Sequence, residues 1–395
     1  MDFKFAKRVN SLEVSSTLAF LNVANEMRAK GIKVIDLGAG EPDFNTPDNI
    51  KRAGIDAIEK NFTKYTSVSG IDELKEIICE RYFIEQRVGF SKDEIIVTSG
   101  SKFSLFLIAL VLFEKGNEVI VPKPFWVTYP ELVKFTESIP KYARIIDDNG
   151  KSVFNADSFL PLINKKTKAI ILNYPSNPTG SIIDEESLKK LSEQAVKKGF
   201  YLIVDDCYRH IIFDNRKFPS IIELYPDARD KIIIVESLSK SYAMTGWRIG
   251  FTLASKEVIE EMNKLQSHST SNPTSISQKA ALEALKGNQD EVEKMRNIYE
   301  KRRNFIISLL KEIRGVEVET PEGSFYAFPS FKYYIENGKF KNTQEISKYL
   351  LEKANVICLP GESFGEPGYI RFSFATSEED IKIGISKIKQ ALESI

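Results

Sequence analysis

The chain has 395 residues, of which 42% are hydrophobic and 28% are charged, and its 55 basic side chains balance its 55 acidic ones. These proportions exclude an intrinsically disordered protein, which combines low hydrophobicity with high net charge. The neutral balance argues against a nucleic-acid-binding protein, because such proteins usually carry a basic excess. The 3 cysteines, none in a CxxC spacing, and the 2 histidines argue against a disulfide scaffold and a histidine-rich metal centre.

The length indicates two or three domain-sized units rather than one small core. The first residues lack the long apolar stretch and the small-residue cleavage site of a signal peptide. The longest apolar runs, such as residues 108–113, fall far short of the ~20 residues that span a bilayer. We therefore expect a cytoplasmic protein that binds neither a membrane nor a nucleic acid.

Short apolar, β-branched runs alternate with longer amphipathic stretches through the middle of the chain. Helical periodicity marks residues 185–199, and a long charged helix is expected at 290–313. Apolar strands joined by helices predict an α/β fold, in which a mostly parallel, doubly wound sheet is buried on both faces. The strand candidates are 94–99, 117–122, 168–173, 201–206, 231–237 and 249–254.

The pattern differs near the two chain ends, and this difference predicts two domains. Residues 46–287 hold the expected strands and form the large domain. Residues 1–45 indicate a helix and an extended arm, and residues 288–395 a long helix followed by short strands and helices. We expect these two ends to build a smaller α/β domain together. Ligands of open α/β sheets bind beyond the strand C-termini, so the site is expected there.

The segment TSGSKFSLF (98–106) turns from a strand into a helix through Gly100. A glycine lets the backbone approach a ligand closely, and the free N–H groups of a helix start attract an anion. An ordinary strand–helix turn is an equal alternative for this segment alone. The segment is not a Walker loop, and residues 38–43 (GAGEPD) lack the third glycine of a dinucleotide fingerprint.

Three further segments each allow a structural and a functional interpretation. Trp126 in PKPFWVTYPE is either core filler or a flat platform for a ring. Asn177 in NYPSNPTG follows a strand, and turn chemistry alone explains its neighbours. In VDDCYRH (204–210), one carboxylate could pair with a protonated ring nitrogen, and Tyr208 could reach a phenolic oxygen. For Asp206 we expect a helix N-cap or a surface position.

The segment SLSKSYAMTGWRIG (237–250) is the most informative part of the sequence. Lysines are rarely buried unpaired, so Lys240 by itself would be assigned to the surface. Ser237, Ser239 and Arg248, however, supply hydroxyl and guanidinium donors suited to a phosphate. A lysine beside a phosphate site is what a Schiff-base cofactor needs.

Arg371 interrupts the apolar, strand-like run GYIRFSFA (368–375). Two interpretations of this arginine stay open from the sequence. It lies on the surface of an edge strand, or it binds a carboxylate with the two nitrogens of its planar fork.

Together these segments resemble the class I, fold-type I aminotransferases that depend on pyridoxal phosphate, and in particular the bacterial branch of aspartate aminotransferases. The most specific element is Ser-x-Ser-Lys-x-Tyr, with Gly246 and Arg248 following at the family's spacing. The resemblance extends from about residue 15 to residue 375 in the family's order. Independent matches occur at 36–47, 122–131, 173–180, 323–328 and 371–375.

The resemblance implies a site for pyridoxal 5′-phosphate. Lys240 would hold the cofactor as a Schiff base and then move a proton from the substrate's α-carbon to the cofactor. Asp205 would pair with the pyridine N–H, while Tyr208 and Asn177 would hydrogen-bond the ring oxygen and Trp126 would stack on the ring. The phosphate would be bound by Gly100, Ser101, Lys102, Ser237, Ser239 and Arg248, and by Tyr65 of a partner subunit. A homodimer with shared active sites is therefore implied.

The resemblance also implies how amino-acid and 2-oxo-acid substrates bind. Arg371 would bind the substrate's α-carboxylate with help from Asn177 and the backbone of Gly40, and Phe325 would line the same pocket. In the bacterial aspartate branch, residues at the positions of Lys102 and Thr17 read the side-chain carboxylate. The implied reaction converts L-aspartate and 2-oxoglutarate into oxaloacetate and L-glutamate.

Alternatives to this reaction stay open. Neighbouring aminotransferase specificities are aromatic, alanine, kynurenine or prephenate. Residues 13–14 are Glu-Val where some relatives, including prephenate enzymes, have Lys-Pro, which makes prephenate the less favoured acceptor. A binding protein that keeps the fold without turnover is a different class. The presence of Lys240, Asp205, Arg248 and Arg371 argues against it.

Overall fold

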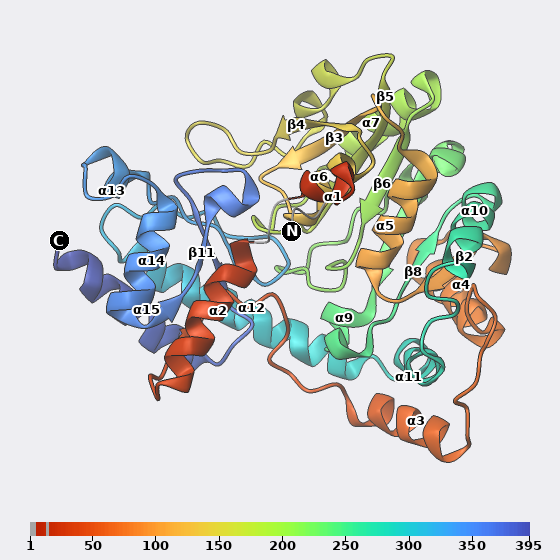
Figure 1. Ribbon diagram of the computed structural model, residues 1–395, viewed down its shortest axis with the longest axis horizontal. Helices are drawn as coiled ribbons and strands as arrows, with labels where there is room; N and C mark the ends of the chain where they lie inside the picture. The colour runs from red at the N-terminus through yellow and green to blue at the C-terminus, as the bar shows by residue number, and fades with distance from the viewer. Residues whose placement is uncertain (1–4, 13–15) are drawn as a thin grey trace.

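A computed structural model describes residues 5–12 and 16–395, and its centre is a seven-stranded sheet in the order β2-β8-β7-β6-β5-β3-β4 (Figure 1). The strands β3, β4, β5, β6 and β7 are mutually parallel, while β8 runs antiparallel to β7 and β2. The strands of this sheet are β2 (Ile95–Thr98), β3 (Glu118–Lys123), β4 (Ile139–Arg144), β5 (Thr167–Asn173), β6 (Tyr201–Asp205), β7 (Ile232–Ser237) and β8 (Gly250–Leu253).

Both faces of the sheet are buried because its strands are apolar at successive positions. In β5, Ile170 and Leu172 join one hydrophobic cluster, whereas Ala169 and Ile171 join a second cluster on the opposite face. Side chains of a strand alternate between the two faces, so a strand covered on both sides must be apolar throughout. The predicted α/β fold with a mostly parallel, doubly wound sheet is confirmed.

Helices cover the two faces of the sheet. One face packs against α5 (Ser101–Leu112), α6 (Thr128–Phe135) and α10 (Lys256–Ser267). The other packs against helices that include α4 (Asp72–Gln86), α7 (Glu185–Lys198) and α11 (Ser275–Lys286), and α3 (Asp48–Glu59) packs on α11. The sequence specifies the ends of α7: the Asp184 side chain accepts from the Ser187 N–H at 2.7 Å, and Gly199 takes a left-handed φ of 80°.

The chain ends pack together in a separate hydrophobic cluster. It contains Ile35 and Leu37 together with residues of α12 (Asp290–Lys311), α14 (Thr343–Ala354) and α15 (Glu378–Glu393). The strand β1 (Ile35–Asp36) pairs in parallel with β10 (Val356–Ile357). A three-stranded antiparallel sheet has the order β11 (Leu359–Pro360), β12 (Ile370–Ser373), β9 (Tyr326–Ala327). The domain boundaries at residues 46 and 288 stay a prediction.

The remaining helices are short or peripheral. No helix in the described ranges, 5–12 and 16–395, is long and apolar enough to cross a bilayer. The short or peripheral helices are α1 (Lys7–Asn10), α2 (Ser16–Ala29), α8 (Ile221–Leu224), α9 (Leu238–Ser241) and α13 (Lys332–Glu336).

Two features of the central sheet differ from the sequence-based expectation. The strand β4 was not predicted, because Pro140, Lys141 and Arg144 interrupt the apolar run in IPKYAR and only Ala143 is buried. It lies at the sheet edge and pairs only with β3, where polar residues and Pro140 are tolerated. The antiparallel direction of β8 was also not predicted, since a buried strand is apolar in either direction.

Candidate active site

A cavity of about 660 Å³ lies where β5, β6 and β7 end. Asn173, Asp205 and Ser237 are the last residues of these three strands, and all three line the cavity. Parallel strands bring their carboxyl ends to one edge of the sheet, so residues far apart in sequence meet there. The predicted site residues that line the cavity are Gly40, Ser101, Lys102, Trp126, Asn177, Asp205, Tyr208, Ser237, Ser239, Lys240, Arg248 and Arg371.

One side of the cavity has the donors that a phosphate requires. The Arg248 guanidinium lies against Gly100, where a Cβ would stand 2.6 Å from Arg248 Nη2. Gly100 has a φ of 88° and precedes Ser101, the first residue of α5, so free helix N–H groups face the same region. The Ser237 hydroxyl donates to the Ser239 hydroxyl at 2.8 Å. A guanidinium, hydroxyls and a helix start fit a dianionic phosphate.

The Asp205 carboxylate is buried and is bound by neutral donors. Its two oxygens accept from the Tyr129 hydroxyl at 2.8 Å and from the Cys207 N–H at 3.3 Å. Burial raises the pKa of Asp205, and these hydrogen bonds oppose the rise. A protonated ring nitrogen would supply the positive charge that stabilises this carboxylate as an anion. The environment therefore fits the pyridine end of pyridoxal phosphate.

Lys240 lies across the cavity, where its Nζ donates to the Gly40 carbonyl. Burial lowers the pKa of the Lys240 amine from the usual 10.5, and the positive charges of Arg371 and Arg248 act in the same direction. A lowered pKa increases the neutral fraction of the amine at a given pH. The neutral amine is the form that attacks an aldehyde carbon and accepts protons.

Arg371 is buried in the middle strand of the three-stranded sheet, with 4% of its surface exposed. Its Nη1 donates to Asn177 Oδ1 at 3.0 Å and its Nη2 to the Gly38 carbonyl at 2.8 Å. The guanidinium also lies 4.2 Å from the centroid of the Tyr326 ring. The interpretation of Arg371 as an exposed residue of an edge strand is therefore wrong. A fixed, buried guanidinium at a cavity wall suits a carboxylate ligand.

Phe325 and Asp206 differ from their sequence-based interpretations. Phe325 is fully buried and packs edge-on against Tyr208, while the next residue, Tyr326, lines the cavity. Asp206 is 2% exposed, and its N–H continues the pairing with β7 by donating to the Val235 carbonyl. Because neighbouring strand residues point to opposite faces, Asp206 points away from Asp205. Burial and Glu236 raise its pKa well above the usual value.

Sequence reasoning also missed three polar residues of the site, which make four hydrogen bonds there. The Tyr129 hydroxyl binds Asp205, and the Tyr326 and Tyr208 hydroxyls lie 3.0 Å apart. Asn173 donates to the Asp205 carbonyl at 2.9 Å and accepts from the Asn177 N–H at 2.9 Å. The position of Asn173 at a strand end was the one signal that could have found it. The two tyrosines have no such signal, because they come from other elements.

Tyr65, Thr17 and Lys102 complete the predicted set. Tyr65 lies in the connection between α3 and α4, is 89% exposed, and is not among the residues that line this chain's cavity. Thr17 belongs to α2, but its side chain lies outside the described residues, as do residues 13–14. Lys102 Nζ lies 4.9 Å from the centroid of the Trp126 ring. Burial, and then Arg248, lowers the pKa of Lys102.

Comparison with known families gives a match to the model described as aminotransferase class I and II, over residues 32–388. A protein of Aquifex aeolicus named "Probable aspartate/prephenate aminotransferase" is 42% identical over 392 residues, which cover 99% of each chain. The aspartate aminotransferase of Geobacillus stearothermophilus is 41% identical over 391 residues, again 99% of each chain.

Solved structures of aspartate aminotransferases are similar to this chain as well. An aspartate aminotransferase from Rhizobium meliloti superimposes with a TM-score of 0.93 at 35% identity and covers 99% of both chains. The Thermus thermophilus aspartate aminotransferase with maleate has a TM-score of 0.92 at 34% identity and covers 99% of this chain and 100% of that one. These chains are similar to this protein along their whole length.

Gly100→Ala tests the proposed phosphate site. The new Cβ would lie 2.6 Å from Arg248 Nη2, and the left-handed φ of 88° disfavours any side chain. We expect the substitution to displace Arg248 and to weaken pyridoxal phosphate binding by about tenfold or more, since strain of this kind costs roughly 1–3 kcal/mol. Binding is measured by absorbance titration of the apoprotein.

Gly246→Ala is the matched control for this prediction. A Cβ at Gly246 meets no atom of residues 5–12 or 16–395 within 4 Å, although Gly246 lies in the same segment as Arg248. We expect it to leave cofactor affinity within about twofold. Equal affinities for the Gly100→Ala and wild-type proteins would contradict the assignment of the phosphate site.

Proposed function

The chain belongs to the class I and II aminotransferases, and on that premise we propose that it uses pyridoxal 5′-phosphate to convert L-aspartate and 2-oxoglutarate into oxaloacetate and L-glutamate. The observation that carries the proposal is the convergence of Lys240, Asp205 and Arg371 on one cavity. The names of the Geobacillus and Rhizobium relatives support the choice of aspartate.

Bound pyridoxal phosphate would accept the electron pair that remains when the substrate's α-carbon loses its proton. Lys240 is the proposed base. Burial increases the neutral fraction of its amine, and a positioned base of this kind contributes roughly 10²–10⁴-fold to a proton transfer. Asp205 would hold a proton on the ring nitrogen, while Tyr129 and the Cys207 N–H fix the orientation of its carboxylate. Tyr208 and Asn177 would donate to the ring oxygen.

The substrate's α-carboxylate would bind to Arg371. Asn177 and the Gly38 carbonyl fix one nitrogen each of this guanidinium, so its orientation is set before the substrate arrives. A preset orientation lowers the entropy lost on binding. Every amino acid and every 2-oxo acid has this carboxylate, so Arg371 would serve both halves of the reaction.

Lys102 and Thr17 are the proposed readers of the substrate's side-chain carboxylate. Lys102 lines the cavity and supplies a positive charge, although burial and Arg248 lower its pKa. A second role for Lys102 is to neutralise the phosphate, because it follows Ser101 at the start of α5. The two roles differ in which substrates a substitution affects.

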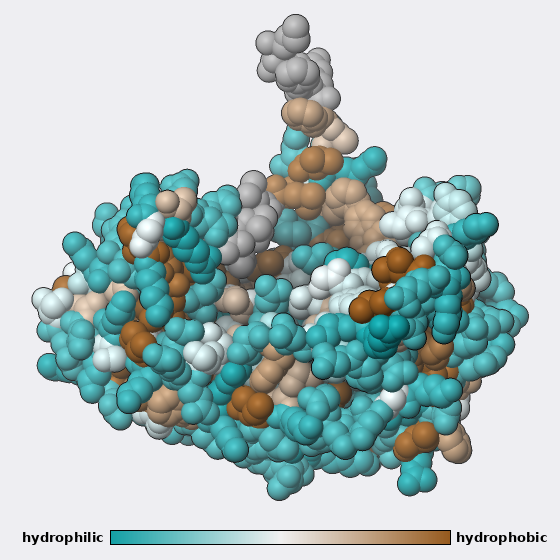
Figure 2. Space-filling view, turned by 90° about the horizontal axis from the view of Figure 1, so that it is seen from below, coloured by the Kyte–Doolittle hydropathy of each residue, from teal (hydrophilic) through white to brown (hydrophobic). Residues whose placement is uncertain are grey.

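A homodimer with shared active sites is also proposed. Tyr65 is a large, 89% exposed side chain, and Ile55, Ile58, Phe83 and Ile84 of the flanking helices α3 and α4 are exposed as well. Figure 2 shows hydrophobic residues in several small patches on one face of the molecule, which is otherwise largely hydrophilic. Exposed apolar patches favour association, and Tyr65 could then reach the partner's cavity.

The first test is a half-reaction with single amino acids. Addition of L-aspartate or L-glutamate to the yellow holoenzyme should shift the cofactor's visible absorbance, and borohydride should fix the cofactor to Lys240 alone. Lys240→Ala should retain cofactor through the phosphate site and lose transamination. A wild-type protein whose spectrum does not respond to any donor would contradict the proposed activity. Peptide mapping of the adduct to another lysine would contradict the role of Lys240.

Lys102→Met tests the choice of substrate. If Lys102 binds the side-chain carboxylate, kcat/KM for aspartate should fall. The fall should correspond to a loss of about 1–3 kcal/mol of transition-state stabilisation, the range for a lost hydrogen bond to a charged group. Alanine and phenylalanine should keep their values. An equal loss for all donors, together with weaker cofactor binding, would assign Lys102 to the phosphate and contradict the aspartate proposal. Prephenate belongs in the acceptor panel because the Aquifex relative is named for it.

Mixed dimers test the shared site. Lys240→Ala and Tyr65→Ala chains are each expected to have low activity. When the two are refolded together, half of the dimers are mixed and have one intact site, so activity should return to about a quarter of wild type. A mixture of Lys240→Ala and Asp205→Asn is the control, because both residues belong to the same chain's site and no intact site can form. Failure of the first mixture to exceed its separate components would rule out sharing through Tyr65.

A further inference from the structure

Residues 38–46, called the strap below, connect β1 with the start of α3 and touch two residues of the proposed chemistry. The Gly38 carbonyl accepts from Arg371 Nη2 at 2.8 Å, and the Gly40 carbonyl accepts from Lys240 Nζ. Residues 38–41 line the cavity with these side chains. The two carbonyls of the strap are therefore direct hydrogen-bond partners of Arg371 and Lys240.

An ion pair with α12 anchors the middle of the strap. Arg302 Nη1 and Nη2 donate to the two oxygens of Asp43 at 2.7 and 2.9 Å. The Arg302 guanidinium also lies 5.0 Å from the ring centroid of Phe44, the next residue of the strap. A two-point bond to a planar fork fixes both the position and the orientation of a carboxylate. Arg302 itself is 7% exposed, so water competes little with this pair.

The strap is also held by hydrogen bonds to the segment that follows Lys240. The Thr46 hydroxyl donates to the Ala243 carbonyl at 2.6 Å and accepts from Trp247 Nε1 at 3.0 Å. Glu41 accepts from the Thr245 hydroxyl at 3.0 Å. The Arg302–Asp43 pair ties the strap to α12 with two hydrogen bonds. Asp43 lies five residues, at most ~18 Å of chain, from Gly38, the partner of Arg371.

We propose that Arg302 is a positioning residue that acts through Asp43 to hold the strap, and thereby the Arg371 fork, in the geometry that binds the substrate's α-carboxylate. This inference rests on the proposed function of the site. Without the anchor, Gly38 keeps only the hydrogen bond from its N–H to Asp36 and the strand pairing of Leu37, so the Arg371 fork is less ordered before the substrate binds. The loss affects the ground state and the transition state alike, so it raises KM and leaves kcat nearly unchanged.

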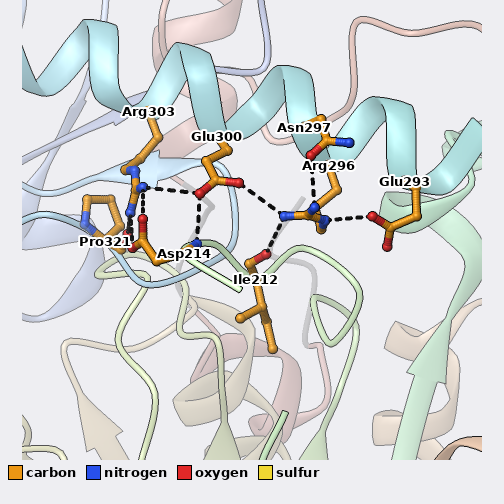
Figure 3. A network of polar contacts seen from close by, with 8 residues as sticks. All are labelled: Ile212, Asp214, Glu293, Arg296, Asn297, Glu300, Arg303 and Pro321. Atoms are coloured by element: carbon orange, nitrogen blue, oxygen red, sulfur yellow. Dashed lines mark hydrogen bonds and ion pairs between the residues drawn. The ribbon is translucent and has the colours of Figure 1, made fainter. Parts of the chain in front are cut away.

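The next residue of α12 supplies a matched control. Arg303 makes the same two-point bond with Asp214, at 2.8 and 2.6 Å, and donates to the Pro321 carbonyl at 2.9 Å. Figure 3 shows this pair beside Glu300 and Arg296 along the same helix. Asp214 is not among the residues that line the cavity, and it does not belong to the strap. Arg303 therefore lies on the same helix as Arg302 and forms the same kind of ion pair with an aspartate, but its aspartate is not part of the strap.

The experiment compares Arg302→Lys, Asp43→Asn, the double variant and Arg303→Lys as holoenzymes. KM and kcat are measured with the amino donor to which the wild type responds most strongly. Maleate, a dicarboxylate that cannot react, is titrated by the cofactor's absorbance. Arg302→Lys and Asp43→Asn should each raise KM and the maleate Kd by about tenfold, as for one lost charge-assisted bond, with kcat within about twofold. The double variant should be no worse than the single ones, because all remove the same interaction.

Several outcomes would overturn the proposal. One is an unchanged KM and maleate Kd in Asp43→Asn, and another is a loss mainly in the kcat of Arg302→Lys or Asp43→Asn. A third is an equal rise of KM in the control Arg303→Lys. That control should only lower the melting temperature. Asp43 is partly exposed, so Asp43→Asn tests the proposal even if Arg302→Lys does not fold. A wild type without any spectral response would refute the proposed function. Active wild-type protein with unaffected variants would refute only the role of Arg302.

Discussion

The site depends on the burial of Lys240, Asp205 and Arg371 around one cavity. Desolvation disfavours a charged group, so it lowers the pKa of Lys240 and of Arg371 and raises the pKa of Asp205. The neighbours of two of these groups stabilise the charged form: neutral donors bind Asp205, and Asn177 and the Gly38 carbonyl bind Arg371. A ligand with a cationic ring nitrogen and carboxylates complements these groups, so binding should also stabilise the fold.

The parallel sheet makes this concentration of polar groups possible. Its strands are apolar on both faces, which leaves their carboxyl ends as the place where polar side chains can meet a cavity. Asn173 and Asp205 are register partners at the ends of β5 and β6. Asn173 bonds both the Asp205 carbonyl and the Asn177 N–H, and Asn177 bonds Arg371. One chain of contacts thus runs from Asp205, the proposed partner of the cofactor ring, to Arg371, the proposed binder of the α-carboxylate.

The sequence was sufficient for features that depend on local pattern. Buried strands and a capped helix such as α7 have a clear signature, and the segment around Lys240 has a spacing specific to one family. The sequence was insufficient for features that depend on contacts between distant parts of the chain. The strand β4 lies at a sheet edge, where its charged residues are tolerated. Asp206 is buried although Glu236 acts unfavourably on its carboxylate, and no local pattern predicts that position. The Tyr129 contact with Asp205 joins residues 76 positions apart, which no local pattern reveals.

The two cationic groups proposed for substrate binding are held in different ways. Arg371 is fixed by two directed hydrogen bonds and lies against the Tyr326 ring. Lys102 lies above the Trp126 ring, a contact that depends little on direction. A fixed fork suits the α-carboxylate, whose geometry is the same in every amino acid. A flexible point charge suits a side chain whose length differs between the two substrates of the proposed reaction, aspartate and 2-oxoglutarate. Rigid binding of the constant group and adaptable binding of the variable one would let a single cavity serve both half-reactions.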